Sequence, residues 1–235
     1  MKLPKLATTI ERRIFLTYAV EPELIASQLP DGIKPKLFNG KASAGVCLIR
    51  MGNIRPAFVK PEVGITAENA GHRIAATYTN AAGEEVDGVY APFRHTSSRL
   101  AVAMSGTLFP GIQRPATFTS LEANGNFKVN MNSKDTLVNV DVDLVDESEW
   151  ESELFPTFAE ASEAYRNGKV ALSPVGSKGN LKTEPLKLEH VYWDIKPAHI
   201  NYAFASSFAL YPKESISLDH ALVMQNVPAY WSNED

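Results

Sequence analysis

The stretch GVYAPFRHTSSRL, residues 88–100, gathers side chains that could bind an anion around a Thr-Ser-Ser turn: Arg94, His95 and Arg99. The small and apolar run LAVAM follows and indicates a helix that begins near Thr96. If Thr96 or Ser97 caps that helix, Arg99 lies in its first turn, where the helix dipole favours anions over cations. This arrangement costs little when an anion occupies the helix end, because free N–H groups and arginine then bind it together.

The ligand-binding candidates in this stretch are Tyr90, Arg94, Ser98 and Arg99. A structural explanation for the same cations stays open. In that case Glu68 or Asp87 supplies the anion as an internal ion pair, and the composition of the stretch does not decide between the two.

A second group of side chains able to do chemistry lies at the entry of the strand-like run ENAGHRIAATYT: Glu68, His72 and Arg73. Alternation along a strand places Arg73 on the same face as Ala75 and Thr77. Because those side chains are small, Arg73 could form the wall of a cavity. The alternative is a salt bridge from Arg73 to Glu84 or Glu85 across the next turn.

The two groups are expected to meet in space. The next predicted strand, VDGVYAPF, follows a short AAGEE turn and ends just before Arg94, so antiparallel pairing places Arg94 beside Arg73. Two adjacent guanidinium groups repel unless a carboxylate or bound anion lies between them, and Glu68 is the nearest upstream candidate. We therefore predict that Arg73, Arg94 and Glu68 line one cavity, closed at one side by the helix near Thr96. Glu68, with His72 as its partner, is the candidate for proton transfer.

Other kinds of site find little support in the sequence. The histidines show no HxH or HExxH spacing, and no GxSxG elbow offers a nucleophilic serine. Asp141 and Asp143 share a strand face and could ligate a hard cation, but such alternation is typical of a strand with one solvent-facing side. Basic and aromatic residues do not interleave on one face, as they do on nucleic-acid-binding surfaces. We expect no metal, no cofactor and no nucleic-acid partner.

Composition points to a cytoplasmic protein. The net charge of −4 gives no general reason to bind nucleic acid or an anionic membrane, and the apolar runs are too short to span a bilayer. The N-terminal stretch does not join a basic start to an apolar run, so we expect no secretory signal. The one cysteine, Cys47, excludes an internal disulfide and a cysteine-based zinc cluster. Its place in the run GVCLI favours inert core packing over a reactive thiol.

The elements that must position these residues are mostly strands. Asn39-Gly40 and Asn124-Gly125 each separate two strand-like runs and predict hairpins. TLVNVDVDLV alternates apolar and polar residues and predicts a half-buried strand, and SISLDHALVMQNVPAYW predicts another. Helices are expected for PELIASQL, after Pro22, and for TFAEASEAYRNG, which has Thr157 as its N-cap and ends at Gly168. We predict a single domain over 1–235, mostly antiparallel β with a few helices.

The order of these motifs resembles a known family. TYAVEPELIASQLPDGIKPKLFNGKASAGVCLIRMGNIRP resembles the opening of the YqjF-like, function-unassigned branch of the acetoacetate decarboxylase-like superfamily. ENAGHRI, GVYAPFRHTSSRL and GTLFPG then match a subgroup pattern, and the likeness spans roughly residues 12–111. It implies a conical, barrel-like antiparallel β fold with peripheral helices and an internal pocket, and Glu68 matches an acidic residue beside that pocket.

The resemblance does not extend to the best-known activity of the superfamily. Acetoacetate decarboxylases form a Schiff base on a lysine of lowered pKa. This chain has no lysine between Lys60 and Lys128, and Thr96 to Arg99 occupy the corresponding region. Arginine stays protonated and does not form an imine, so Schiff-base decarboxylation is not expected.

Two functions remain open at this point. In one, the protein is an enzyme acting on a small oxo- or hydroxy-acid by acid/base chemistry, with arginines holding the carboxylate or a developing oxyanion. In the other, it is a non-catalytic protein that binds a small carboxylate-like ligand in the same pocket. The sequence leaves open whether the chain also associates with a second copy of itself.

Overall fold

The computed structural model describes residues 4–60, 62–80, 82–105, 111–175 and 182–233. The strands of this part of the chain are β1 (Leu6–Val20), β2 (Ile33–Pro35), β3 (Leu37–Phe38), β4 (Lys41–Pro56), β5 (Ile65–Thr79), β6 (Glu85–Tyr90), β7 (Arg94–Thr96), β8 (Gln113–Ala123), β9 (Asn126–Ser133), β10 (Leu137–Leu144), β11 (Val170–Val175), β12 (Lys182–His190), β13 (Lys196–Ala205) and β14 (Ile216–Asn233). The α-helices are α1 (Pro22–Ala26), α2 (Arg99–Ala103) and α3 (Phe158–Asn167), and the 3₁₀ turns are η1 (Glu147–Glu149) and η2 (Lys213–Ser215).

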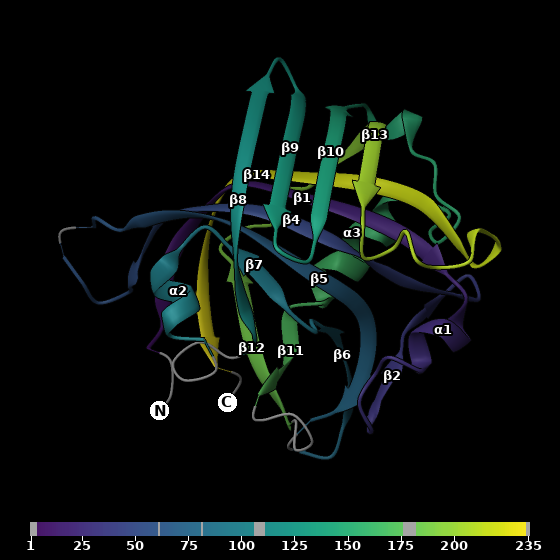
Figure 1. Cartoon of the computed structure of the whole chain (residues 1–235), viewed down its shortest axis with the longest axis horizontal. Coiled ribbons are helices and arrows are strands. Elements are labelled where there is room, and N and C mark those ends of the chain that lie inside the picture. Colours follow the sequence, from purple (N-terminus) through teal and green to yellow (C-terminus); the bar gives the residue numbers. More distant parts are fainter. Residues whose placement is uncertain (1–3, 61, 81, 106–110, 176–181, 234–235) are drawn as a thin grey trace.

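Four long strands form the centre of the molecule, in the order β14-β1-β4-β5. Strands β7, β8, β9, β10 and β13 connect β5 back to β14 on one side, and β6, β11 and β12 connect the same two strands on the other. The sheet therefore closes on itself along two routes that share the central strands. In Figure 1, β8, β9, β10 and β13 rise above these strands, and β6, β11 and β12 lie below them. This distorted barrel confirms the prediction of a mostly β, barrel-like architecture with a few helices.

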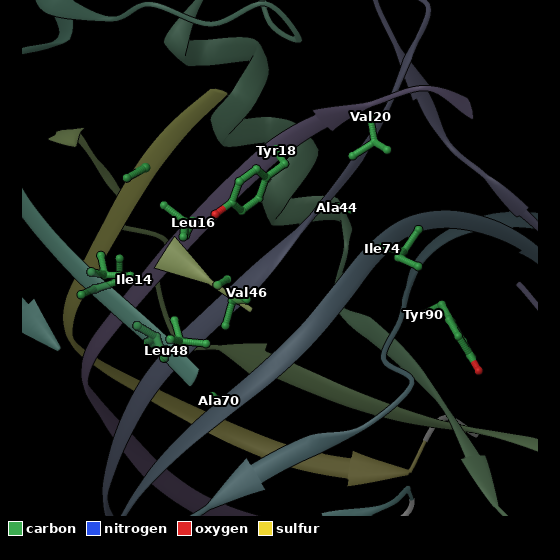
Figure 2. Close-up of a cluster of buried hydrophobic side chains, with 14 of the residues drawn as sticks. Ile14, Leu16, Tyr18, Val20, Ala44, Val46, Leu48, Ala70, Ile74 and Tyr90 are labelled. Atoms are coloured by element: carbon green, nitrogen blue, oxygen red, sulfur yellow. The ribbon is translucent and has the colours of Figure 1, made fainter. Parts of the chain in front are cut away.

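The central strands bury both of their faces. Ile14 and Leu16 of β1 and Val46 and Leu48 of β4 point into the larger apolar core, which also contains valines of β10 (Figure 2). The intervening residues point the other way, where Phe15 packs with side chains of α3 in a second apolar cluster. Because successive side chains of a strand face opposite sides, each central strand supplies two separate environments.

The two predicted hairpin turns and the predicted alternating strand are confirmed. Asn39 and Gly40 both have positive φ, 47° and 80°, as do Asn124 and Gly125, at 51° and 83°. Two successive residues with positive φ give the turn whose twist matches a hairpin, and Asn-Gly tolerates it. These turns join β3 to β4 and β8 to β9, and the alternating run over 137–144 forms β10.

Helix boundaries differ more from the predictions. The helix α3 begins and ends as expected, with the Thr157 hydroxyl accepting from the Glu160 backbone N–H at 3.2 Å. The helix α1 stops at Ala26 rather than continuing to residue 29. The predicted strand over 86–93 is also interrupted, because β6 ends at Tyr90 and Arg94 begins the separate strand β7.

In the described part of the chain no helix is long and apolar enough to cross a membrane. The same residues contain no cluster of histidine, cysteine or acidic side chains placed to hold a metal ion. The motif GTLFPG falls largely on residues 106–110, which lie outside the described residues.

Candidate functional site

A row of cross-strand partners runs over the central strands, on the face turned away from the larger core. Phe15 of β1 lies opposite Cys47 of β4, and Cys47 lies opposite Gly71 of β5. Gly71 is in turn opposite Arg94 of β7. Because glycine has no side chain, the row has a gap between the Cys47 sulfur and the Arg94 side chain. A Cβ added to Gly71 would meet no atom within 4 Å, so this gap is open space.

A cavity of about 200 Å³ lies over this row. Much of its wall is apolar and includes Ile49 of β4, Leu188 of β12 and Trp231 of β14. The basic and imidazole side chains in its lining are Arg13, His72, Arg73, Arg94, Lys169 and His190. No aspartate or glutamate is found among the described residues that line it. As far as the described residues show, the site is therefore a largely apolar cavity whose charged lining groups are cationic.

Arg73 lies two residues beyond Gly71 on β5, on the same face. Its guanidinium packs over the ring of Tyr165, with Cζ 4.6 Å from the ring centroid, and over the ring of Phe15 at 5.0 Å. No described carboxylate forms a salt bridge with Arg73. Burial lowers the pKa of Arg73 from its ordinary value, because desolvation penalises the charged form. An anion in the cavity would offset that penalty.

Arg94 enters the cavity from β7. A Cβ on Gly111 would lie 2.9 Å from Nη1 of Arg94, so the guanidinium packs directly against this glycine. Gly111 has a φ of +87°, which side chains rarely tolerate, so glycine serves both the turn and the close approach. Burial lowers the pKa of Arg94 to about 10, which still leaves the group charged at neutral pH.

Arg13 connects the cysteine of the row to a histidine. Its Nε donates a hydrogen bond to Sγ of Cys47 at 3.1 Å, and its Nη1 lies 3.1 Å from Nε2 of His190. Burial, followed by the charges of Arg13 and Lys169, lowers the pKa of His190 to about 3. The imidazole is therefore neutral and accepts from Arg13. Cys47 is 7% exposed, which confirms that it is buried, but it also lines the cavity.

Tyr165 of α3 supplies the aromatic surface beside Arg73 and is held by a chain of polar groups. Its hydroxyl is hydrogen-bonded to the Thr17 hydroxyl and lies 3.0 Å from Nε2 of His220. Nδ1 of His220 is bonded in turn to Asp219. Burial raises the pKa of Tyr165, so the phenol stays neutral. These hydrogen bonds fix the position of the Tyr165 ring, and the ring limits where the Arg73 guanidinium can lie.

The expected carboxylate of the site, Glu68, lies on the other face of β5. It forms an ion pair with Nη2 of Arg12, whose Nη1 binds Glu122 at 2.7 Å. Arg12 is fully buried. Arg73 and Arg94 thus line the same cavity, whereas Glu68, which was expected to join them, lies on the other face. The reason is strand parity, because residues 68 and 73 of one continuous strand must point to opposite faces.

His72 contributes to the lining, but its ring is held on the Glu68 side of the strand. Its Nδ1 lies 3.2 Å from the Ser207 hydroxyl, and its ring packs against Phe93 and His95 with centroid separations of 4.5 and 5.6 Å. Burial lowers the pKa of His72 to about 3, so the imidazole is neutral. The structure does not bring Glu68 and His72 together as an acid/base pair facing the ligand space.

Of the remaining candidates from residues 88–100, one lines the cavity and two do not. Ser98 lines the cavity and is the N-cap of α2, with its hydroxyl accepting from the Ala101 backbone N–H at 3.2 Å. The cap is thus not Thr96 or Ser97. Arg99 is exposed and outside the lining, and Tyr90 is a buried member of the larger apolar core (Figure 2).

The carboxylates proposed as structural partners for these cations are bound elsewhere. Glu68 pairs with Arg12, and Asp87 pairs with Lys36. The alternative salt bridge from Arg73 to Glu84 or Glu85 is also not formed.

Several lining residues were not predicted from the sequence: Arg13, Cys47 as a cavity residue, Tyr165, Lys169 and His190. One signal for Arg13 was present, because alternation in the run ERRIFL already separates its face from that of Arg12. The others come from distant segments that meet only when the sheet closes.

Comparison with known proteins places these features in a family context. The model of the DUF2071 family, described as an uncharacterized conserved protein (COG2071), matches residues 7–221. No curated protein matches the chain.

Solved structures share the fold at low sequence identity. An acetoacetate decarboxylase-like enzyme from Sphingomonas wittichii RW1 has a TM-score of 0.60 and 11% identity, with 99% of this chain and 92% of that chain covered. Acetoacetate decarboxylase from Legionella pneumophila has a TM-score of 0.57 and 13% identity, covering 97% and 84%. The enduracididine biosynthesis enzyme MppR, complexed with pyruvate, has a TM-score of 0.57 and 9% identity, covering 98% and 89%. At these identities the likeness shows the fold, and the YqjF-like branch stays a prediction.

Proposed function

Because the chain belongs to the DUF2071 family and has an acetoacetate decarboxylase-like fold, we propose that its cavity binds a small oxo- or hydroxy-acid. Arg73 and Arg94 are the proposed carboxylate-binding residues, with Ser98 at the cavity wall. The location in the cytoplasm and any association between copies of the chain stay predictions.

The observation that supports this proposal is the imbalance of charge in the cavity. Arg13, Arg73 and Arg94 enter a mainly apolar space, and the described lining contributes no carboxylate. Arginine binds carboxylates through paired N–H donors, and such charge-assisted hydrogen bonds are strongest where water is excluded. The open space over Gly71 lies beside Arg94 and on the same face as Arg73.

The size of the ligand follows from the size of the space. A cavity of about 200 Å³ suits a molecule of a few heavy atoms rather than a nucleotide or a long acyl chain. The fold relative MppR was solved with pyruvate, a three-carbon oxo-acid, and pyruvate is therefore the probe of choice.

A Schiff base does not form part of the proposal. Lys169 is the single lysine among the described residues of the lining, and it is exposed. A Schiff-base lysine requires an amine that is deprotonated near neutral pH, which usually needs burial or a neighbouring cation in a dry site.

Binding is supported more directly than catalysis. Glu68 and His72 are held on the opposite face of β5, and Nε2 of His190 already accepts from Arg13. An enzymatic function remains the second candidate, because guanidinium groups around a bound oxo-acid would stabilise the enolate formed by loss of a proton next to the carbonyl.

Calorimetric titration with pyruvate tests the proposal. Arg73→Met and Arg94→Met should each weaken binding by roughly tenfold or more, since a hydrogen bond to a charged group contributes about 1.5–3 kcal/mol. Arg166→Met removes an exposed guanidinium from α3 and serves as the matched control, which should bind like the wild type. Equal affinity in all four proteins would refute the site.

Proton NMR of pyruvate in D₂O separates the two candidate functions. Loss of the methyl signal catalysed by the wild type and not by Arg73→Met would indicate an enzyme that forms an enolate. Binding without exchange would indicate the non-catalytic alternative.

A further inference from the structure

Cys47 borders the proposed ligand space directly. It lies opposite Gly71, which lies opposite Arg94, so the Cys47 and Arg94 backbones are two strand spacings, or about 10 Å, apart. The missing side chain at Gly71 leaves the space between them open. A carboxylate held by Arg94 over Gly71 would therefore place the rest of a two- or three-carbon acid toward the Cys47 sulfur.

Two guanidinium groups define the surroundings of that sulfur. Arg13 donates to it through Nε at 3.1 Å, which fixes the side chain, while the other end of the same guanidinium is held by His190. Arg73 lies on β5 opposite Gly45, which is two residues before Cys47 on β4. Its charge is therefore close enough to interact with the thiol.

Arg73 has no negatively charged partner among the described residues. Its guanidinium is partly buried, packs over the rings of Phe15 and Tyr165, and has no hydrogen bond or ion pair among the described residues. The thiol is thus one wall of a space that holds a partly buried cation with no ion pair among the described residues, and a ligand carboxylate would supply the counter-charge.

We propose that Cys47 is a nucleophile of this cavity, and that it reacts with small carboxylic acids carrying an electrophilic carbon next to the carboxylate or one bond further, such as 2-halo and 2-enoic acids. The inference rests on the proposed function, because Arg73 and Arg94 must hold the carboxylate. Their contribution is placement, which raises the local concentration of the electrophile at the sulfur.

The bonds and charges balance in both cases. With a 2-halo acid, an S–C bond forms as the C–halogen bond breaks, halide leaves, and the thiol proton passes to water. With a 2-enoic acid, sulfur bonds to the β-carbon, the π electrons move to the α-carbon, and that carbon takes up a proton in place of the one lost by the thiol.

Paired alkylating reagents test the proposal, because Cys47 is the one cysteine of the chain. The rates of modification by iodoacetate and by neutral iodoacetamide are measured by intact-mass spectrometry, with N-acetylcysteine as the reference thiol. The ratio of iodoacetate to iodoacetamide rates should be at least about tenfold higher at Cys47 than in the reference, as expected for a charge-assisted contact. Pyruvate or acetate should slow the reaction with iodoacetate.

Variants assign that preference to the arginines. Arg73→Met should lower the ratio of iodoacetate to iodoacetamide rates at Cys47 to that of N-acetylcysteine, whereas Arg166→Met should retain the wild-type ratio. Circular dichroism checks that each variant is folded. The protection by pyruvate is measured on the wild-type protein, so that result does not depend on the folding of any variant.

The outcomes separate this inference from the proposed function. If pyruvate binds by calorimetry but the reagent ratio equals that of N-acetylcysteine, Cys47 is inert and the binding function stands. If pyruvate does not bind and no preference is seen, both are refuted.

Discussion

Replacing Gly71 with alanine is expected to stabilise the protein and weaken ligand binding at the same time. Gly71 lies within β5, and a Cβ at this position meets no atom within 4 Å. Alanine at a compatible position restricts the unfolded chain, so the free energy of unfolding should rise by about 0.4–1 kcal/mol. The new methyl group nevertheless occupies the space proposed for the ligand.

The matched control is Gly45→Ala on the neighbouring strand β4. A Cβ there would lie 2.1 Å from the backbone oxygen of Leu16, which cannot move without shifting β1. Overpacking of this kind is expected to destabilise the fold by about 1–3 kcal/mol. The two glycine substitutions, close together on one sheet, should thus change stability in opposite directions.

Urea unfolding with linear extrapolation measures both stabilities, and pyruvate titration measures binding. A third variant, Gly71→Leu, fills the gap more completely and should abolish binding. If Gly71→Ala destabilises the protein as Gly45→Ala does, the space over Gly71 is not open. If Gly71→Leu binds pyruvate like the wild type, the ligand does not lie there.

Other predictions follow from the opposite face of β5 and from the cavity rim. Arg12→Met should destabilise the fold by about 3 kcal/mol, because it leaves Glu68 and Glu122 without their buried partner, and Glu68→Gln in the same chain should recover part of that loss in urea unfolding. The folded protein keeps His72 neutral down to about pH 3, whereas the unfolded chain takes up the proton near 6.5. The contribution of His72 to stability should therefore fall as pH falls between these values, by up to about 1.4 kcal/mol per pH unit, and His72→Gln should show a shallower slope than the wild type; equal slopes would contradict this assignment. Borohydride in the presence of acetoacetate should trap no adduct by mass spectrometry, and an adduct mapped to Lys169 would overturn the proposal of chemistry without a Schiff base.

Short-range rules predicted the local elements well. The Asn-Gly turns need two residues of positive φ, which few other residue pairs tolerate, so the hairpins at Asn39 and Asn124 could be identified from the sequence. The buried valines of β10 and the Thr157 cap of α3 also depend only on residues within a few positions of each other.

The site was predicted less completely because it depends on strand parity and on closure of the sheet. β5 starts at Ile65 rather than at Arg73, so Glu68 is part of the strand and points away from the cavity. Parity could have shown this once the start of the strand was known. The positions of Tyr165 and His190 could not be found in that way, because α3 and β12 reach the cavity only through long-range pairing and packing.

The adjacent arginines of β1 limit how the sequence of this protein can evolve. Arg12 neutralises the carboxylates of one face and Arg13 borders the ligand space of the other, although one peptide bond joins them. Insertion or deletion of a single residue in this half of β1 would exchange their faces and leave both environments with the wrong charge. Point substitutions at cavity positions leave the other face unchanged. New ligand preferences should therefore arise in this fold by exchange of side chains, while the lengths of its central strands stay fixed.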